Sequence, residues 1–181
     1  MNEITIADKK IGINHPPFIV AEMSGNHNQS LERALKIAEA AHKAGVDALK
    51  LQTYTADTIT INEKSGNFVI NNPNGLWKGK TLYELYQQAY TPWEWHKPIF
   101  ERCRELGLIA FSTPFDETAV EFLEDLNVPA YKIASFENNH LPLLKKVAST
   151  RKPVIISTGM ASITDLDLAI STIRDSGCND I

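Results

Sequence analysis

Short apolar runs alternate with longer amphipathic stretches along most of the chain. The apolar runs begin near Phe18, Ala48, Leu108, Tyr131 and Val154. Each is followed by a stretch with helical spacing, such as the one that opens at the N-cap candidate Ser30 and ends at Gly45. Regular alternation of strands and helices predicts parallel strands joined by right-handed crossovers.

The helices are expected over residues 30–45, 81–89, 91–107, 116–126, 141–149 and 162–176, and a hairpin is expected over Ile4–Ile13 within an N-terminal region of residues 1–17. For the helix near Thr91 the sequence predicts a threonine N-cap, with Pro92 at the first helical position and Glu94 two residues later. A long connection, residues 56–80, separates the second strand from the third. Its tryptophan, Trp77, would either cover a ligand or anchor the loop.

About five strand–helix units do not close an eight-stranded barrel. We therefore expect residues 1–181 to form the N-terminal portion of an α/β, (β/α)8 TIM-type barrel, with the remaining strands missing. A doubly wound open sheet is the alternative. The first strand is not followed by Gly-x-Gly-x-x-Gly, which weakens the dinucleotide-binding version of that fold.

Composition narrows the possible partners. The chain has 181 residues, 43% hydrophobic residues and a formal net charge of −4, which gives no electrostatic footprint for nucleic acid or an anionic membrane. Two distant cysteines, Cys103 and Cys178, are typical of reduced thiols rather than of a disulfide framework. With no leader pattern at the N-terminus and no apolar run of membrane-spanning length, we expect a cytoplasmic protein.

Two lysines interrupt strands that should be apolar. Lys132 lies within Tyr131–Glu137, and Lys50 lies within Ala48–Tyr54. Because a strand of a parallel sheet is covered on both faces, an embedded cation needs a reason. Polar side chains recur at the carboxyl end of each strand, where a barrel has its active site: Glu22, Lys50, Gln52, Thr113, Lys132, Ser135, Glu137 and Ser157.

Two ammonium groups and three hydroxyls (Thr113, Ser135 and Ser157) suit a phosphate or a carboxylate. The alternative is that each lysine pairs with a nearby carboxylate, for instance Lys132 with Glu137. Taken together, the residues favour the anion site.

Two glutamates, Glu22 and Glu137, are acid/base candidates beside these cations. Asn26 and His27 follow Glu22 and could contact a sugar hydroxyl or a metal. A single histidine is weak support for metal ligation, so a structural role in the loop or a substrate contact is favoured for His27. The run Ser157-Thr158-Gly159 lacks the nucleophile-elbow pattern and does not support a hydrolase triad.

Five motifs in order resemble the N-terminal barrel of the sialic acid synthase family. They are Ala21–His27, Leu49–Thr53, Phe111–Phe115, Tyr131–Glu137 and Ile156–Met160. Within the family, the first motif and residues 75–96 are most similar to the branch that makes pseudaminic acid.

The resemblance implies condensation of phosphoenolpyruvate with an N-acetylated amino sugar, a 6-deoxy diacetamido hexose, to give a nonulosonic acid and phosphate. Neuraminic or legionaminic acid synthesis, and a non-catalytic partial barrel that binds sugar or phosphate, are the alternatives. The family's phosphoenolpyruvate-binding positions correspond to Lys50, Thr113, Lys132, Ser135 and Ser157. Its catalytic carboxylates correspond to Glu22 and Glu137, while Gln52, Asn26 and His27 are weaker sugar-binding candidates.

The resemblance also implies a divalent metal, Mn²⁺ or Mg²⁺, and a homodimer. In the family the metal ligands come from later barrel strands, and a C-terminal antifreeze-like domain reaches into the partner subunit's site. Both regions are expected to lie outside this chain. We therefore expect no metal ligands within it and no turnover by it alone.

Overall fold

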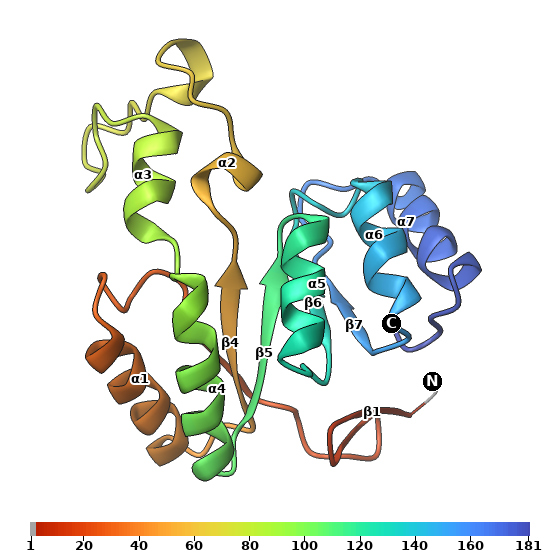
Figure 1. The fold of residues 1–181 in the computed structure, drawn as a ribbon. Helices are drawn as coiled ribbons and strands as arrows, with labels where there is room; N and C mark the ends of the chain where they lie inside the picture. Colours follow the sequence, from red (N-terminus) through yellow and green to blue (C-terminus); the bar gives the residue numbers. More distant parts are fainter. Residues whose placement is uncertain (1–2) are drawn as a thin grey trace.

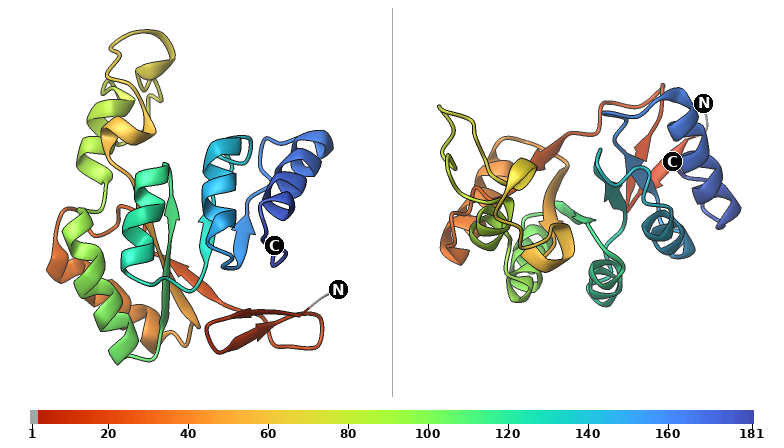
Figure 2. Two further views of the ribbon diagram at one scale, coloured as in Figure 1. Left: turned by 45° about the vertical axis from the view of Figure 1, so that its right-hand side comes forward. Right: turned by 90° about the horizontal axis from the view of Figure 1, so that it is seen from above.

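The computed structural model describes residues 3–181 and contains a five-stranded parallel sheet. The strand order follows the chain: β3 (Val20–Glu22), β4 (Ala48–Thr53), β5 (Ile109–Pro114), β6 (Tyr131–Ile133) and β7 (Val154–Ile156). Seen from above, the strands follow an arc with the helices on its outer side, as in part of a β/α barrel (Figure 2). The predicted fold, the N-terminal portion of a TIM-type barrel, is confirmed.

The helices are α1 (Leu31–Lys43), α2 (Ala56–Ile59), α3 (Leu82–Ala89), α4 (His96–Glu105), α5 (Glu117–Asp125), α6 (Leu141–Ser149) and α7 (Ile163–Asp175). Each helix except α2, which forms the start of the long connection, lies within a predicted range (Figure 1). Two short 3-10 turns, η1 (Gly66–Phe68) and η2 (Trp93–Trp95), complete the long connection and the approach to α4. The expected hairpin is formed by β1 (Ile4–Ile6) and β2 (Lys9–Ile11), which pair antiparallel.

Local signals explain where several helices begin and end. The Ser30 side chain accepts a hydrogen bond from the Arg33 amide at the start of α1, and Gly45 follows the last turn with a φ of 77°. Thr81 forms a capping box with Glu84 at α3, and Ser162 forms one with Asp165 at α7. These helices therefore begin where the sequence predicts.

The predicted cap of α4 is wrong. Thr91 makes no capping bond, and a 3-10 turn precedes α4, which begins at His96. Instead, the buried Thr91 hydroxyl lies 3.1 Å from Nε2 of His27, a residue far away in sequence. The long-range hydrogen bond replaces the local one that the motif predicts.

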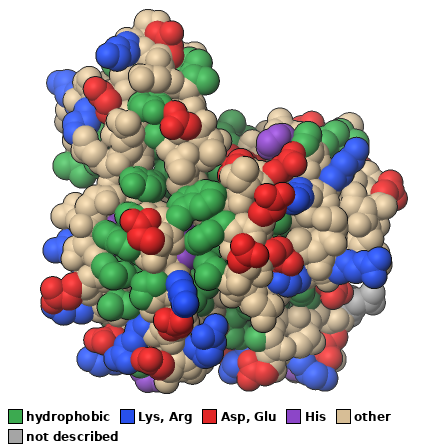
Figure 3. Space-filling model, viewed as in Figure 1, with side chains coloured by type: hydrophobic (Ala, Val, Ile, Leu, Met, Phe, Trp, Pro, Cys, Tyr) green, Lys and Arg blue, Asp and Glu red, His purple; other side chains and the backbone are tan. Residues whose placement is uncertain are grey.

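The core fills the space between the sheet and the outer helices. Leu51 of β4, Ile99 of α4, Tyr131 of β6 and Leu144 of α6 are all fully buried. Burying one such leucine or isoleucine contributes about 1.5–3 kcal/mol. Hydrophobic side chains also gather near the middle of the face that carries α4 and α5 (Figure 3).

The strand register separates two faces of the sheet. Thr53 of β4 points to the helices, because its hydroxyl lies 2.8 Å from Nε2 of His96 in α4. Side chains alternate along a strand, so Lys50 and Gln52 lie on the opposite, inner face. Their register partners on β5 are Phe111 and Thr113. The inner face at the carboxyl ends of the strands is thus where the polar residues meet.

Within the described residues, no helix is long and apolar enough to cross a membrane. Both cysteines, Cys103 and Cys178, are buried free thiols, as the sequence predicts.

Candidate functional site

Three neighbouring strands are joined by polar contacts on the inner face. Glu22, the last residue of β3, is the register partner of Lys50 on β4, and the two side chains form an ion pair. The Lys50 ammonium also donates to the hydroxyl of Thr113 on β5 over 3.4 Å. Thr113 itself is buried, so its hydroxyl is held in place by the surrounding strands. The expectation that a lysine pairs with a carboxylate is therefore correct for Lys50.

Lys132 has a different environment. It lies on β6 opposite Ile155 of β7, and its ammonium donates to the Ser157 hydroxyl and, over 2.6 Å, to the Ile133 carbonyl. Within residues 3–181 Lys132 forms no ion pair, so the alternative pairing of Lys132 with Glu137 is wrong. Lys132 is thus a half-buried cation that only neutral oxygens contact.

The surroundings of Lys132 destabilise its charge. Burial, followed by the nearby positive charge of Lys50, lowers the pKa of Lys132 to about 8, although Glu22 and Glu137 oppose this effect. Two cations close enough to repel each other on one face form a site that a bound anion would stabilise. This electrostatic arrangement supports the anion-site interpretation better than the residue types alone.

Glu137 lies in the connection between β6 and α6. Its Oε2 is buried, and in the part of the chain that the structure describes this atom has no hydrogen-bond partner. Burial raises the pKa of Glu137 above its ordinary value, although the charge of Lys132 opposes the change. A raised pKa favours the protonated form of the carboxyl group, which is the form that a general acid needs.

A hollow of about 460 Å³ lies against Glu137. It is lined by Thr58, Ile59, Phe115, Phe136, Glu137, Asn139 and His140. These residues come from α2, the end of β5 and the β6–α6 connection, so the long loop after β4 forms one wall. Phe136 is 73% exposed, which is unusual for a large aromatic side chain without a partner.

Ser135 lies beside the loop that follows β7. A Cβ atom at Gly159 would come within 2.8 Å of the Ser135 hydroxyl oxygen, so any other residue at this position would require Ser135 to move. Ser135, Lys132 and Ser157 therefore belong to the same pair of strand ends, as expected for three of the predicted donor-binding residues.

The weaker candidates are engaged in the loop after β3. Gln52 accepts a hydrogen bond from the Ser24 hydroxyl over 3.2 Å, and the Asn26 amide donates to the Met23 carbonyl over 2.9 Å. His27 is fully buried, with Nε2 at the Thr91 hydroxyl and Nδ1 accepting from the Gln29 amide. Its ring also packs edge-on against Trp95 at 5.6 Å. This geometry fits the structural role among the alternatives for His27.

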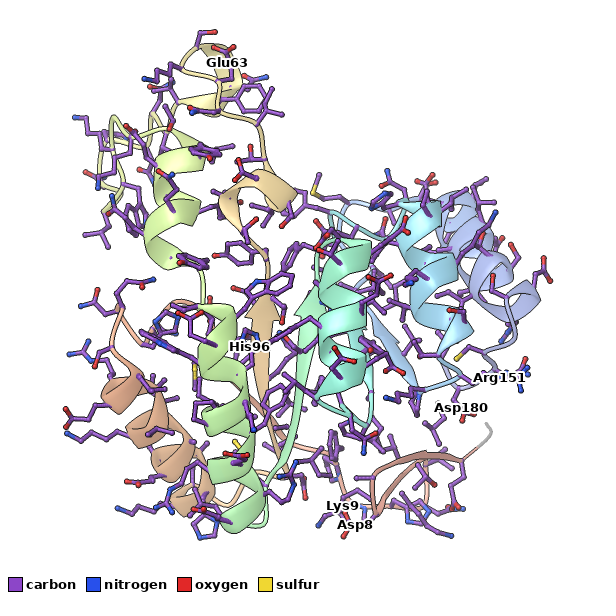
Figure 4. All side chains as sticks on the ribbon, viewed as in Figure 1. Asp8, Lys9, Glu63, His96, Arg151 and Asp180 are labelled. Carbon is purple, nitrogen blue, oxygen red and sulfur yellow. The ribbon has the colours of Figure 1, made fainter. Side chains whose placement is uncertain are left out.

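A buried hydroxyl–imidazole chain was not predicted. Thr53 lies 2.7 Å from the Ser112 hydroxyl and 2.8 Å from His96, whose pKa burial lowers to about 4. Figure 4 shows His96 at the start of α4, beside β4. Because these three hydrogen-bonded side chains lie on the helix-facing side of the sheet, they stabilise the packing of β4 and β5 against α4 and do not form part of the inner face. Only the register of β4 and β5 could have revealed it.

A protein-bound metal ion needs several ligating side chains close together. Residues 3–181 contain no group of three or more His, Cys, Asp or Glu that could hold a metal ion. The described residues therefore do not fit a metal on their own.

The fold and the site define a class: part of a β/α barrel with its polar groups at the carboxyl ends of the strands. The NeuB family model matches residues 37–181, and the chain belongs to the NeuB family. The resemblance to sialic acid synthases found in the motifs is thereby confirmed.

Two comparisons illustrate this membership. The chain is 51% identical over 159 residues to a pseudaminic acid synthase of Helicobacter pylori, covering 88% of this chain and 46% of that protein. The crystal structure of spore coat polysaccharide biosynthesis protein SpsE from Bacillus subtilis matches with a TM-score of 0.80 and 38% identity, covering 99% of this chain and 46% of that one.

A third match is the N-acetylneuraminic acid synthetase of Leptospira borgpetersenii, crystallised with citrate. Its TM-score is 0.82 at 28% identity, covering 98% of this chain and 56% of that one. The chain thus spans about half the length of the relatives that it matches.

Proposed function

We propose that this chain supplies the phosphoenolpyruvate-binding part of a nonulosonic acid synthase. The reaction joins C3 of phosphoenolpyruvate to the aldehyde carbon of an open-chain N-acetylated amino sugar. Water adds at C2 of the donor, and the C–O bond to phosphate breaks. The products are a nonulosonic acid and inorganic phosphate.

The observation that supports this proposal most is the pair of lysines on one face. Phosphoenolpyruvate has a phosphate and a carboxylate, and Lys50 and Lys132 would balance their charge. Thr113 and Ser157 already contact these ammonium groups, and Ser135 lies beside the same loop. The Leptospira relative was crystallised in complex with citrate, which like phosphoenolpyruvate is a small molecule with more than one anionic group.

The two carboxylates would have separate roles. Glu137, with its buried Oε2 and raised pKa, would hold a proton and deliver it to the aldehyde oxygen as the new bond forms. Glu22, held by its ion pair with Lys50, would lie on the acceptor side. The family resemblance also implies a divalent ion, Mn²⁺ or Mg²⁺, whose ligands are expected outside residues 3–181.

For the acceptor we propose a 6-deoxy diacetamido hexose, the precursor of pseudaminic acid. Among the seven residues that line the hollow beside Glu137, Ile59, Phe115 and Phe136 are apolar and would contact the methyl group of such a sugar, while the polar residues would face its amide and hydroxyl groups. The 51% identity to a pseudaminic acid synthase supports the same choice. Neuraminic and legionaminic acid precursors, which have a hydroxylated terminal carbon or a different ring configuration, are the acceptors to compare.

Further parts of the proposal concern the whole protein. Later barrel strands with the metal ligands, an antifreeze-like domain and a homodimer are expected from the family resemblance. A cytoplasmic location is expected from the two distant cysteines. Because residues 3–181 contain no metal-binding cluster, we expect the 181-residue chain alone to bind phosphoenolpyruvate without turnover. This expectation also describes the second candidate, a partial barrel that only binds phosphate or sugar.

Phosphate release is the direct test. The protein at its natural length would be incubated with phosphoenolpyruvate, Mn²⁺ and each candidate sugar, and both phosphate and the nonulosonic acid would be measured. Turnover with the 6-deoxy diacetamido hexose is expected to exceed that with the other sugars. Binding of phosphoenolpyruvate without turnover with any sugar would favour the second candidate. Absence of phosphoenolpyruvate binding would refute the proposed function.

A further inference from the structure

Asn138 has a buried side-chain amide and no role in the reaction proposed above. It follows Glu137 in the β6–α6 connection and is only 4% exposed. Its Nδ2 donates to two carbonyl oxygens of the loop after β7, that of Ser157 at 3.2 Å and that of Gly159 at 3.3 Å. Asn138 therefore links two loops that come from neighbouring strands.

The two linked loops, together with Lys132 of β6, contain residues of the proposed phosphoenolpyruvate site. Ser157, whose carbonyl accepts from Asn138, uses its hydroxyl to accept from Lys132. Gly159, the other acceptor, lies so close to the Ser135 hydroxyl that an added Cβ atom would displace Ser135. A shift of this loop would therefore separate Ser157 from Lys132 and change the position of Ser135.

Backbone pairing ends too early to hold the loop. β6 and β7 pair only from Tyr131–Val154 to Ile133–Ile156, and the last backbone bond runs from the Ser157 amide to the Ile133 carbonyl over 2.9 Å. Beyond that point Thr158, Gly159 and Met160 are exposed, and Met160 has a φ of 65°, which is costly for a residue with a side chain. The Asn138 amide continues the connection past the end of the ladder.

The chemistry of the contact requires an amide. Two carbonyl oxygens need two N–H donors, and the asparagine side chain supplies both from one nitrogen. An aspartate has the same shape, but its carboxylate and the two carbonyl oxygens are all hydrogen-bond acceptors, so both hydrogen bonds would be lost. It would also place a negative charge next to a site proposed to bind an anion.

From this geometry we propose that Asn138 is a positioning residue for phosphoenolpyruvate: its amide fixes the Ser157–Gly159 loop so that Lys132, Ser135 and Ser157 face the donor together. The inference rests on the proposed function, because it assigns a role within the same donor site. Asn138 acts through its neighbours and needs no contact with the substrate.

The test compares Asn138→Asp with Asn14→Asp in the protein at its natural length. Asn14 is exposed in the turn before β3, so its substitution adds the same charge away from the site. For Asn138→Asp we expect the KM for phosphoenolpyruvate to rise at least tenfold while the KM for the sugar stays within twofold. At lower pH the new carboxyl becomes protonated and can donate one hydrogen bond, so the KM ratio to the parent protein should fall. Asn14→Asp should match the parent protein.

A second variant, Gly159→Ala, covers the case in which Asn138→Asp does not fold. The added methyl group pushes against Ser135 at the same joint, and we expect the same selective rise in the KM for phosphoenolpyruvate. Equal changes in both KM values, or a lowered melting temperature with an unchanged KM for phosphoenolpyruvate, would overturn the positioning role. If the parent protein itself neither binds nor consumes phosphoenolpyruvate, the proposed function fails before any variant is compared.

Discussion

Replacing Lys132 with methionine should stabilise the fold and abolish the binding of phosphoenolpyruvate. Methionine has nearly the length of the lysine side chain but no charge, so it removes the repulsion from Lys50 and the cost of burying an ammonium group. The Ile133 carbonyl keeps its hydrogen bond from the Ser157 amide, and the half-exposed Ser157 hydroxyl can bind water. The substitution therefore creates no new buried polar group without a partner.

The size of the effect follows from the pKa. A lysine whose pKa falls from the ordinary 10.5 to about 8 loses about 3.4 kcal/mol of stability in its charged form, at 1.36 kcal/mol per pKa unit. Lys132 is only half-buried, and solvent screening reduces this value to about 1–2 kcal/mol. For a protein of this size the gain raises the melting temperature by about 2–4 °C per kcal/mol.

The pH dependence gives the sign of the same effect. Between pH 8 and 10.5 the unfolded chain keeps the Lys132 proton while the folded protein releases it, so this residue makes stability rise with pH in that window. Other groups titrate there too, so the quantity to measure is the difference between Lys132→Met and the parent protein. The gain from the substitution should be largest below pH 8 and should vanish towards pH 10.5.

Urea unfolding from pH 7 to 10 measures this difference, with Lys145→Met as the control on the exposed side of α6. The control should change the unfolding free energy by no more than about 0.5 kcal/mol. Calorimetry with phosphoenolpyruvate measures binding in parallel. A loss of stability in Lys132→Met, or a difference that does not change with pH, would refute the assignment of Lys132 as an uncompensated cation.

Three further predictions concern other parts of the molecule. Glu137→Gln keeps the shape of the side chain but removes its acidic proton, so kcat for the complete enzyme should fall by about 10²–10⁴-fold with little change in the KM for phosphoenolpyruvate. Steady-state kinetics would measure both values. An unchanged kcat would exclude Glu137 as the general acid. Thr53→Val removes the hydroxyl between His96 and Ser112 and should cost about 1–3 kcal/mol in urea unfolding, whereas a neutral result would show that this buried chain contributes nothing. Burial raises the pKa of Cys103 to about 12, so a maleimide at pH 7.5 should label it in urea but not in the native protein; rapid native labelling, located by mass spectrometry, would contradict its burial.

Much of the fold could be predicted because the strong local signals agree with the tertiary structure. β4 begins at Ala48, where the apolar run was predicted to begin, and α6 has the predicted bounds, Leu141–Ser149. The failure at Thr91 has the opposite cause, because its hydroxyl is taken by His27 across the fold. A capping motif reports only the donors and acceptors nearby in sequence, and it cannot reveal a competing partner from another element.

The candidate site was predictable in its residue types but not in its pairings. Both lysines stood out within their strands, yet only the register shows that Glu22 lies opposite Lys50. The roles of Asn138 and Gly159 depend on two loops that meet in space, and neither residue belongs to a pattern that signals this contact.

The unequal environments of the two lysines suggest how such a site can persist in a folded protein. Neutralising both with carboxylates would stabilise the fold and leave little attraction for an anion. Leaving both unpaired would add their desolvation costs to their mutual repulsion. Here Glu22 neutralises Lys50, while Lys132 has no carboxylate partner among residues 3–181. The fold bears the cost of one uncompensated cation, and a donor with two anionic groups would relieve it on binding. Such a site is therefore expected to become more stable when the donor is bound, and the loop fixed by Asn138 determines whether that gain is realised.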